Sequence, residues 1–363
     1  MTENINENGE IFMTMKALIV EDINAIALKE VEIPPLKPDE ILVKVVYAGV
    51  CGTDLAIFSG ETSFVKEGLI KYPARIGHEW SGTVANIGAK VTKFKAGDRV
   101  VSDNAITCRE CEACKSGNMA GCSNMKCVGT INCWDGSFAE YIIIPECHLH
   151  QLPDTISLKT AALIEPISIA LGGTNKRKID IETTVVIIGT GPIGLAAVAL
   201  AKNAGAKSVI IIGRTTSKLD IALQVGASAV VNTSEKDAIK AVLELTNNHG
   251  ADFIIETSGA KETIQLAIDI AAERGTISLI GFYETNIDGL VIDRFVMKQA
   301  SLVGVMGEFG FVPAVIEIME ITDLHLEHII TQIVSFDGAV EFFNNAKATA
   351  KQRIKTLVKI AEE

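Results

Sequence analysis

Four cysteines fall within fifteen residues of the chain, at spacings that suit a metal ion. Cys108, Cys111 and Cys114 are separated by two residues each, and Cys122 follows eight positions later. Four thiolates on short spacers can complete a tetrahedral shell around Zn²⁺, which leaves no position for a substrate. Four unrelated buried cysteines, or a redox-sensing group, are the alternatives. We interpret the cluster as a structural zinc site that fixes a loop.

A glycine-rich motif, Gly189-Thr-Gly191-Pro192-Ile193-Gly194, directly follows the apolar run TTVVII and opens a helical pattern. Glycines at these positions permit a tight turn, close approach of a pyrophosphate and close packing of the helix on the strand. The helix N-terminus adds a favourable field for phosphates. Because the motif lies between a strand and a helix, it predicts dinucleotide binding rather than a glycine turn without a ligand.

The next predicted strand, SVIIIG, ends where many dinucleotide-binding domains carry an acidic residue for the ribose hydroxyls. Gly213 and Arg214 stand there instead, and Lys218 adds a second positive charge nearby. A small residue followed by a cation leaves room and charge for a 2′-phosphate. The sequence therefore favours NADP, with NAD as the alternative if Arg214 is an ordinary solvated cation.

A third set of residues is spread along the chain. Cys51, with Thr53 close behind it, lies 27 residues before His78, and Glu165 follows much later. One thiolate, one imidazole and one carboxylate can hold Zn²⁺ with an open position, as a catalytic zinc requires. Isolated cysteines and histidines are more often core residues, so the spacing alone leaves this hypothesis open.

Two kinds of structure must position these residues. Residues 16–99 and 137–152 consist of short runs that alternate apolar and polar residues between Gly and Pro, which is typical of β-strands. From residue 184 onward, apolar strand candidates alternate with helical stretches, which indicates a parallel sheet covered on both faces. The predicted fold class is α/β, with a β-rich part and a nucleotide-binding part.

Length and charge narrow the classes of function. The chain has 363 residues and a formal net charge of −12 without a basic block, so we expect about two domains and no nucleic-acid partner. The apolar run at 185–201 is shorter than the ~20 residues that span a bilayer and contains glycines and a proline, so we expect no membrane segment. Cysteines without an export signal predict a reducing, cytoplasmic compartment.

The chain resembles the zinc-dependent medium-chain alcohol dehydrogenases, in particular the branch of sorbitol and polyol-phosphate dehydrogenases. The motifs that carry the resemblance occur in the family's order and include, besides the four cysteines, CGTD at 51–54, GHEWSG at 77–82, AGDRV at 96–100, DGSFAEY at 135–141, IEP at 164–166 and GTGPIG at 189–194.

The resemblance implies a domain organisation. A flexible extension at 1–14 precedes a β-rich, GroES-like catalytic domain at 15–167 and 296–363. A Rossmann domain, a doubly wound parallel sheet that binds NAD(P), is inserted at 168–295. Relatives form dimers or tetramers, often through the sheet edge of the nucleotide-binding domain, so we expect a homodimer or homotetramer. The run ASLVGV at 300–305 is a candidate for this edge strand.

The resemblance also implies a catalytic zinc beside the structural one, about two per chain. Cys51 and His78 resemble catalytic zinc ligands, whereas Glu79 and Glu165 each resemble a residue that ligates or approaches the metal in different members. Thr53 resembles the hydroxyl that receives the substrate's proton. The implied reaction moves a hydride between NAD(P) and a secondary alcohol of a polyol or a sugar-alcohol phosphate, with NADP favoured. The carboxylate of Asp54 resembles one that orients the ligand histidine.

Two positions depart from the family's pattern. Many sorbitol and threonine dehydrogenases carry a histidine where Ala56 stands, and sorbitol dehydrogenases carry an Arg-Tyr pair where Gly307 and Glu308 stand. A threonine-type amino-alcohol dehydrogenase, or a zinc- and nucleotide-binding protein without turnover, are the alternative functions. Arg75 is expected to be a solvated charge. His148 and His150 have no cluster of partners in the sequence and receive no role.

Overall fold

The computed structural model describes residues 2–5, 11–307 and 309–363. These residues divide into two compact units. The first comprises 1–165, 332–349 and 356–363, and the second comprises 166–331 and 350–355. Among the described residues, no helix is both long and apolar enough to cross a membrane.

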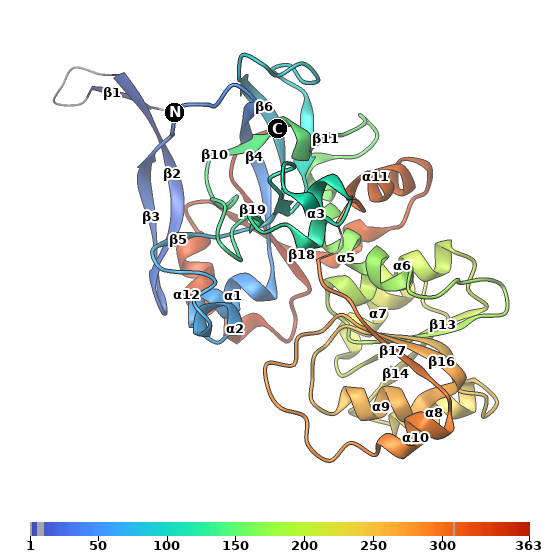
Figure 1. Ribbon diagram of the computed structural model, residues 1–363. Helices are drawn as coiled ribbons and strands as arrows, with labels where there is room; N and C mark the ends of the chain where they lie inside the picture. Colours follow the sequence, from blue (N-terminus) through green and yellow to red (C-terminus); the bar gives the residue numbers. More distant parts are fainter. Residues whose placement is uncertain (1, 6–10, 308) are drawn as a thin grey trace. The chain divides into compact units, whose positions relative to one another are not determined.

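The first unit is mainly β-structure (Figure 1). Its larger sheet has the strand order β11-β7-β6-β4-β19-β18, with β10 paired to β4, and a smaller sheet contains β1, β2, β3 and β5. The strands are β1 (Thr2–Ile5), β2 (Ile11–Asp22), β3 (Ala25–Glu32), β4 (Glu40–Val50), β5 (Ala74–Arg75), β6 (Glu79–Ile87), β7 (Arg99–Ser102), β8 (Ala105–Ile106), β9 (Lys126–Cys127), β10 (Tyr141–Pro145), β11 (Leu149–Gln151), β18 (Ile330–Ser335) and β19 (Lys355–Lys359).

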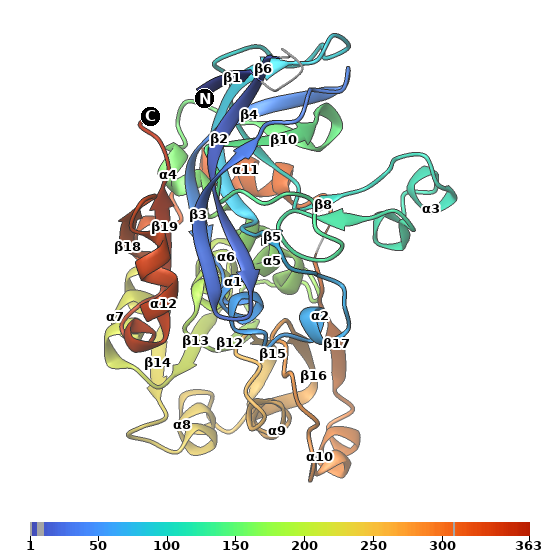
Figure 2. The ribbon, with the colours of Figure 1, turned by 90° about the vertical axis from the view of Figure 1, so that its left-hand side faces the viewer.

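Helices of the first unit are short and close the ends of strands. They are α1 (Gly52–Ser59), α2 (Ser63–Lys66), α3 (Glu112–Lys115), α4 (Leu158–Ala161) and α12 (Ala339–Thr349), with 3₁₀ turns η1 (Met119–Gly121) and η2 (Glu146–His148). The core lies between the sheets and α12, where Phe138, Phe342 and Phe343 meet edge to face. The segment around α3 projects sideways from this unit (Figure 2).

The second unit is a parallel sheet with helices on both faces (Figure 1). Its strand order is β14-β13-β12-β15-β16-β17, which by position in the chain reads 3-2-1-4-5-6, the order of dinucleotide-binding domains. The strands are β12 (Thr184–Ile188), β13 (Ser208–Gly213), β14 (Ala229–Asn232), β15 (Ala251–Glu256), β16 (Ala271–Leu279) and β17 (Ser301–Gly304). Residues of β12 are buried along their whole length because helices cover both faces.

The helices associated with this sheet are α5 (Ile164–Thr174), α6 (Pro192–Asn203), α7 (Thr216–Gln224), α8 (Ala238–Leu245), α9 (Thr263–Ile270), α10 (Ile292–Met297), α11 (Val312–Ile321) and the 3₁₀ turn η3 (Leu326–Ile329). The doubly wound α/β class is confirmed by this topology, as is the prediction that 300–305 contain an edge strand.

The boundaries differ from those expected. Residues 296–331 were assigned to the catalytic domain, but β17 pairs with β16 as the sixth strand of the parallel sheet, so this segment belongs to the second unit. Residues 350–355 also return to the second unit. In the expected flexible extension, β1 pairs in antiparallel register with β2, which begins at Ile11.

Candidate functional site

Three donor groups meet at the ends of two core strands in the first unit. The donor atoms of Cys51, His78 and Glu79 all lie within 4.8 Å of one another. Cys51 follows β4, whereas His78 and Glu79 lie at the start of the neighbouring strand β6. The imidazole of His78 is 6% exposed and Glu79 is 1% exposed, so these donors are buried. The pairing of β4 with β6 therefore brings Cys51 close to His78 and Glu79, which lie 27 and 28 positions later in the sequence.

The pairing of β4 with β6 also makes room for Glu79. Gly49 lies opposite Glu79 in the antiparallel register. A Cβ atom on Gly49 would lie 2.3 Å from Glu79 Oε2, so any larger residue would displace the carboxylate. Thr53, in the first turn of α1, lies with its hydroxyl 3.7 Å from Cys51 Sγ. The hydroxyl expected to receive a proton therefore adjoins the donor group.

Asp54 supports the two ligand-bearing segments through their backbones. Its Oδ2 accepts a hydrogen bond from the Cys51 N–H at 2.8 Å, and its Oδ1 accepts one from the Gly77 N–H at 3.2 Å. His78 Nδ1 lies 3.5 Å from Oδ1, which is ion-pair distance without hydrogen-bond geometry. Asp54 is fully buried, so its carboxylate fixes the spacing of both segments.

The chemistry of this donor set suits a zinc ion. Burial opposes protonation of His78, but the charges of Asp54 and Cys51 raise its pKa well above its usual range. The same negative charges favour a metal cation, and a thiolate, an imidazole and a carboxylate are ligands that Zn²⁺ takes in catalytic sites. Cys51, His78 and Glu79 would hold the metal.

Glu165, the other carboxylate that resembles a residue ligating or approaching the metal, is not among the three donors whose atoms lie within 4.8 Å of one another. Its Oε1 accepts a hydrogen bond from Asn104 Nδ2 at 3.1 Å. Cys127 is a half-buried thiol whose pKa burial raises, and the charges of His78 and Glu165 both act on it. No sequence motif marks Asn104 or Cys127: Cys127 pairs with Ala105 in the ladder of β8 with β9, and Asn104 directly precedes β8 and accepts from the Val128 N–H.

The four clustered cysteines come together as expected, and we call the segment that carries them, residues 108–122, the lobe. Their sulfur atoms lie within 4.8 Å of one another. The sulfur atoms of Cys108 and Cys122 are 3.6 Å apart, and the Cys111 N–H donates to Cys108 Sγ at 3.4 Å. Backbone N–H groups lower the pKa of Cys108 to about 6, whereas desolvation and neighbouring thiols raise the pKa of Cys114 to about 12. Four thiols this close fit a Zn²⁺ ion, which would favour ionisation of all four.

The glycine motif forms the expected turn between β12 and α6. Gly189 has a φ of +113°, which L side chains rarely adopt, and a Cβ atom on Gly194 would lie 2.1 Å from Gly189 O. Gly191 caps α6 and Pro192 is its first residue. Nothing lies within 4 Å of a Cβ built on Gly191, so this glycine faces open space at the helix N-terminus. A pyrophosphate could approach the backbone there.

Three cations, Arg214, Lys218 and Arg353, lie near the end of β13, and Arg353 was not identified among them from the sequence. Lys218 Nζ donates to Ala350 O at 3.2 Å, which places the returning segment 350–355 beside α7. Burial, followed by the positive charges of Arg353 and Arg214, lowers the pKa of Lys218. Arg353 could not be found from the sequence, because it lies 135 positions beyond Lys218.

Arg75 is not the solvated cation that was expected. It is 8% exposed, and its Nη2 lies 3.2 Å from Asp135 Oδ2. Its backbone oxygen accepts from the Gly136 N–H at 2.9 Å. The side chain therefore fastens the loop at 133–136 to the strand that leads to His78.

Fold and site together define a two-part enzyme with a metal-binding β-rich unit and a dinucleotide-binding unit. The model of the alcohol dehydrogenase GroES-like domain matches residues 37–154, and that of the zinc-binding dehydrogenases matches residues 192–320. The chain belongs to the zinc-dependent medium-chain alcohol dehydrogenase family, in its polyol dehydrogenase-like branch, and is an NAD(P)-dependent alcohol dehydrogenase.

Individual relatives span nearly the whole chain. Sorbitol dehydrogenase of Bacillus subtilis is 29% identical over 99% of both chains. L-Threonine 3-dehydrogenase of Pyrococcus horikoshii is 32% identical over 92% of this chain and 95% of its own length. A zinc-binding dehydrogenase of Sinorhizobium meliloti, solved with bound NADP, has a TM-score of 0.87 and 29% identity, covering 96% of this chain and all of that chain.

Proposed function

We propose that this enzyme transfers a hydride between NADP and a secondary alcohol of a polyol or a sugar-alcohol phosphate. The observation that carries the proposal is the buried group of Cys51, His78 and Glu79 in a chain that matches a sorbitol dehydrogenase over 99% of its length. Zinc, when bound, supplies Lewis acidity that makes a substrate hydroxyl easier to deprotonate.

The protein's own groups have separable roles in this scheme. Cys51 and His78 would hold the metal from the adjacent ends of β4 and β6, with Glu79 as the carboxylate ligand. Thr53, whose hydroxyl lies 3.7 Å from Cys51 Sγ, would take up the substrate's proton. Glu165, which accepts a hydrogen bond from Asn104, is a second carboxylate and resembles a residue that ligates or approaches the metal in different family members. The nucleotide carries the redox chemistry.

The preference for NADP rests on the cations at the end of β13. Gly213 leaves no acidic side chain to repel a 2′-phosphate, and Arg214, Lys218 and Arg353 lie close enough for their charges to interact. A phosphate would bring these cations a counter-charge and charge-assisted hydrogen bonds. NAD carries a ribose hydroxyl there and would bring no negative charge to these three cations.

A threonine-type substrate is the alternative, because the relative from Pyrococcus horikoshii is 32% identical. Ala56 argues against it, since many threonine and sorbitol dehydrogenases have a histidine there for proton relay. Sorbitol dehydrogenases carry an Arg-Tyr pair where this chain has Gly307 and Glu308, and Glu308 lies outside the described residues. Because Ala56 stands where many sorbitol dehydrogenases have a histidine, we favour a polyol other than sorbitol as the substrate.

Initial rates over one substrate panel test the proposal. The panel holds sorbitol, xylitol, arabitol, their phosphate esters, inositols and threonine, each with NADP and with NAD, using chelator-treated enzyme as the control. We expect metal-dependent turnover of one polyol class, faster with NADP. Turnover of threonine alone would contradict the substrate class. Equal or better turnover with NAD would contradict the cofactor preference and leave the metal chemistry intact.

The cofactor preference has its own mutational test. Arg214→Gln should weaken NADP binding about tenfold, because one charge-assisted bond to phosphate is lost, and should leave NAD binding unchanged. Gly213→Asp is a poorer test, since a Cβ at Gly213 would lie 2.4 Å from the methyl of Thr190. An unchanged ratio of NADP to NAD affinity in Arg214→Gln would show that the 2′-phosphate pocket is misplaced.

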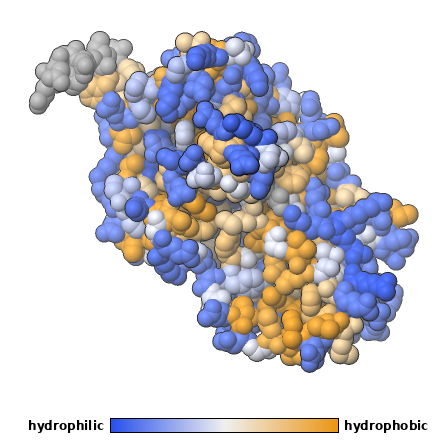
Figure 3. All heavy atoms as spheres, viewed as in Figure 1, coloured by the Kyte–Doolittle hydropathy of each residue, from blue (hydrophilic) through white to orange (hydrophobic). Residues whose placement is uncertain are grey.

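We further propose that the enzyme is a homodimer or a dimer of dimers joined through β17. This edge strand is mostly exposed, and apolar side chains that are exposed cluster around it and α10. They include Val291, Ile292, Val296, Met297, Leu302 and Met306. Figure 3 shows apolar surface over this part of the second unit. Light scattering of Leu302→Lys should show half the wild-type mass; retention of the wild-type mass would contradict this interface. Residence in the cytoplasm stays a prediction.

A further inference from the structure

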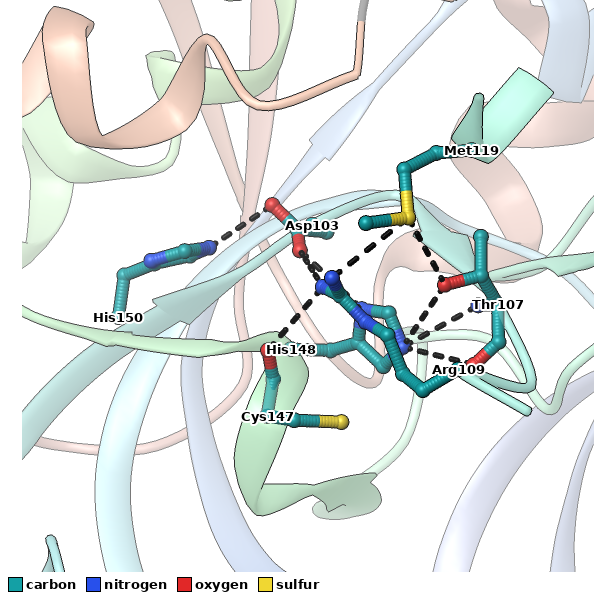
Figure 4. A network of polar contacts seen from close by, with 7 residues as sticks. All are labelled: Asp103, Thr107, Arg109, Met119, Cys147, His148 and His150. Carbon is teal, nitrogen blue, oxygen red and sulfur yellow. Dashed lines mark hydrogen bonds and ion pairs between the residues drawn. The ribbon is translucent and has the colours of Figure 1, made fainter. Parts of the chain in front are cut away.

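A buried histidine, His148, contacts the two residues that flank Cys108 in the chain. His148 is 1% exposed, with Nδ1 3.1 Å from Asp103 Oδ2 and Nε2 3.0 Å from Thr107 O (Figure 4). Burial opposes its protonation, but the hydrogen bond to Asp103 and the nearby Cys147 raise its pKa to about 9. The Thr107 N–H also points at Nε2, at 3.2 Å, and Arg109 Nη2 lies 3.5 Å from Nδ1, so Thr107 and Arg109 both contact the ring.

The contacts of this ion pair reach both neighbours of Cys108. Thr107, whose carbonyl accepts from His148, directly precedes Cys108. Arg109 directly follows it and extends its guanidinium back to the same place, with Nη2 3.9 Å from Asp103 Oδ2 and 3.4 Å from Cys147 O. Arg109 also has a positive φ of 59°, which turns the chain sharply at this point. The first arm of the four-cysteine lobe is therefore held from both sides.

The residue after Asp103 contacts Glu165, whose charge, like that of His78 in the catalytic donor group, acts on Cys127. Asn104 Nδ2 donates to Glu165 Oε1 at 3.1 Å. The backbone holds this pair of residues firmly, because the Asp103 N–H donates to His148 O and the Val128 N–H donates to Asn104 O, both at 2.9 Å. Two adjacent side chains directly after β7 thus have different partners: Asp103 contacts His148 beside the lobe, and Asn104 contacts Glu165 on the side of the catalytic donors.

We propose that Asp103 and Asn104 tie the two metal sites together, with His148 as the positioning residue that holds the tie. Loss of the His148 contacts would release Thr107 and Arg109 on one side and shift Asn104, and with it Glu165, on the other. Packed side chains joined by hydrogen bonds transmit such displacements because they have few alternative arrangements. The proposal rests on the two metal sites and not on the substrate or nucleotide, so the substrate panel leaves it standing whatever its result.

Zinc release to a chromogenic chelator from the full-length holoenzyme tests the tie. The release phases are assigned with Cys51→Ser, which lacks a catalytic ligand, and Cys111→Ser, which lacks a lobe ligand. The test variants are His148→Gln and Asn104→Leu. The matched control is His150→Gln, because His150 Nε2 bonds the other oxygen of Asp103 at 2.8 Å and lies on the side away from Thr107 (Figure 4).

The second readout is the visible spectrum of Co²⁺ placed in the catalytic site while zinc occupies the lobe. Its bands report the geometry of the catalytic ligands, which a general loss of stability would not shift. We expect His148→Gln to speed both release phases about tenfold, in the range found for outer-shell partners of metal ligands, and to shift the cobalt bands. Asn104→Leu should speed the catalytic phase alone and shift the bands, and His150→Gln should do neither.

Two results would overturn the proposal. If His148→Gln speeds only the lobe phase and leaves the cobalt spectrum unchanged, His148 anchors the lobe and ties nothing to the catalytic site. If it changes neither phase, it does not anchor the lobe either. Should His148→Gln fail to fold, Asp103→Asn replaces it, because the amide keeps the shape of the carboxylate and removes its charge.

Discussion

The two metal sites of the first unit are supported in different ways. The catalytic donors lie at the ends of β4 and β6, two long core strands, and a fully buried Asp54 bonds the backbone beside them. The lobe cysteines lie on a projecting loop with only one four-residue helix and one 3₁₀ turn (Figure 2). The catalytic site is shaped by the sheet, whereas the lobe has little structure besides its four sulfur atoms.

Because of this difference, we expect the catalytic site to govern turnover and the lobe site to govern the stability of the fold. A site built by the core should keep its shape without a metal, so losing a ligand there should affect turnover far more than folding. A loop that lacks its own core gains its order from the metal, because metal binding free energy becomes folding free energy.

Cys111→Ser should destabilise the lobe by several kcal/mol, because the zinc site that orders it is lost. Thermal unfolding and hydrogen exchange across residues 108–122 measure the effect, with Cys133→Ser as a control that removes a thiol outside both groups. An unchanged melting temperature and unchanged exchange in Cys111→Ser would refute the structural role.

Gly49→Ala should weaken the catalytic site while leaving the lobe intact. The added Cβ would lie 2.3 Å from Glu79 Oε2, so the carboxylate must move and overpacking should cost about 1–3 kcal/mol. Metal affinity and kcat are the measurements. Gly52→Ala is the matched control, because a Cβ there has nothing within 4 Å. Wild-type affinity and kcat in Gly49→Ala would mean that the position of Glu79 does not matter.

The stabilisation from His148 should depend on pH. Its pKa is about 9 in the folded chain against an ordinary value of 6.5, so the contribution is complete below pH 6.5 and is lost as the pH rises through 9. Asp103 has its pKa lowered from 3.8 to about 2, despite burial, by the bonds to His148 and His150, so its contribution is lost only as the pH falls through 2.

Urea unfolding of wild type and His148→Gln across this range measures the difference in free energy of unfolding. The difference should shrink between pH 6.5 and 9. A difference that stays constant over this interval would show that His148 does not fold as an imidazolium.

Features formed by residues close in sequence could be predicted more fully than those formed by residues that only the fold brings together. Four cysteines close in sequence and a glycine turn between a strand and a helix are set by covalent spacing, so Cys108–Cys122 and Gly189–Gly194 could be interpreted without a structure. The catalytic group needed the resemblance, because only the register of β4 against β6 brings Glu79 beside Cys51.

What could not be predicted lies in long-range contacts between segments without motifs. Asn104 reaches Glu165 across 61 positions, and His148 reaches Thr107 across 41. The boundary at 295, taken from the family resemblance, lies too early in the chain: it conflicts with the expected edge strand at 300–305, and the pairing of β17 with β16 assigns that strand to the second unit.

We propose that Cys51, His78 and Glu79 form the catalytic metal site and that the four lobe cysteines form a separate structural one. Zinc content and NADP-dependent turnover, measured together on wild type and Cys51→Ser, test it most directly. We expect about two zinc ions per chain and polyol turnover in wild type, and about one zinc, near-wild-type stability and a loss of at least about 10³-fold in turnover in Cys51→Ser. Turnover close to wild type in Cys51→Ser would contradict the account.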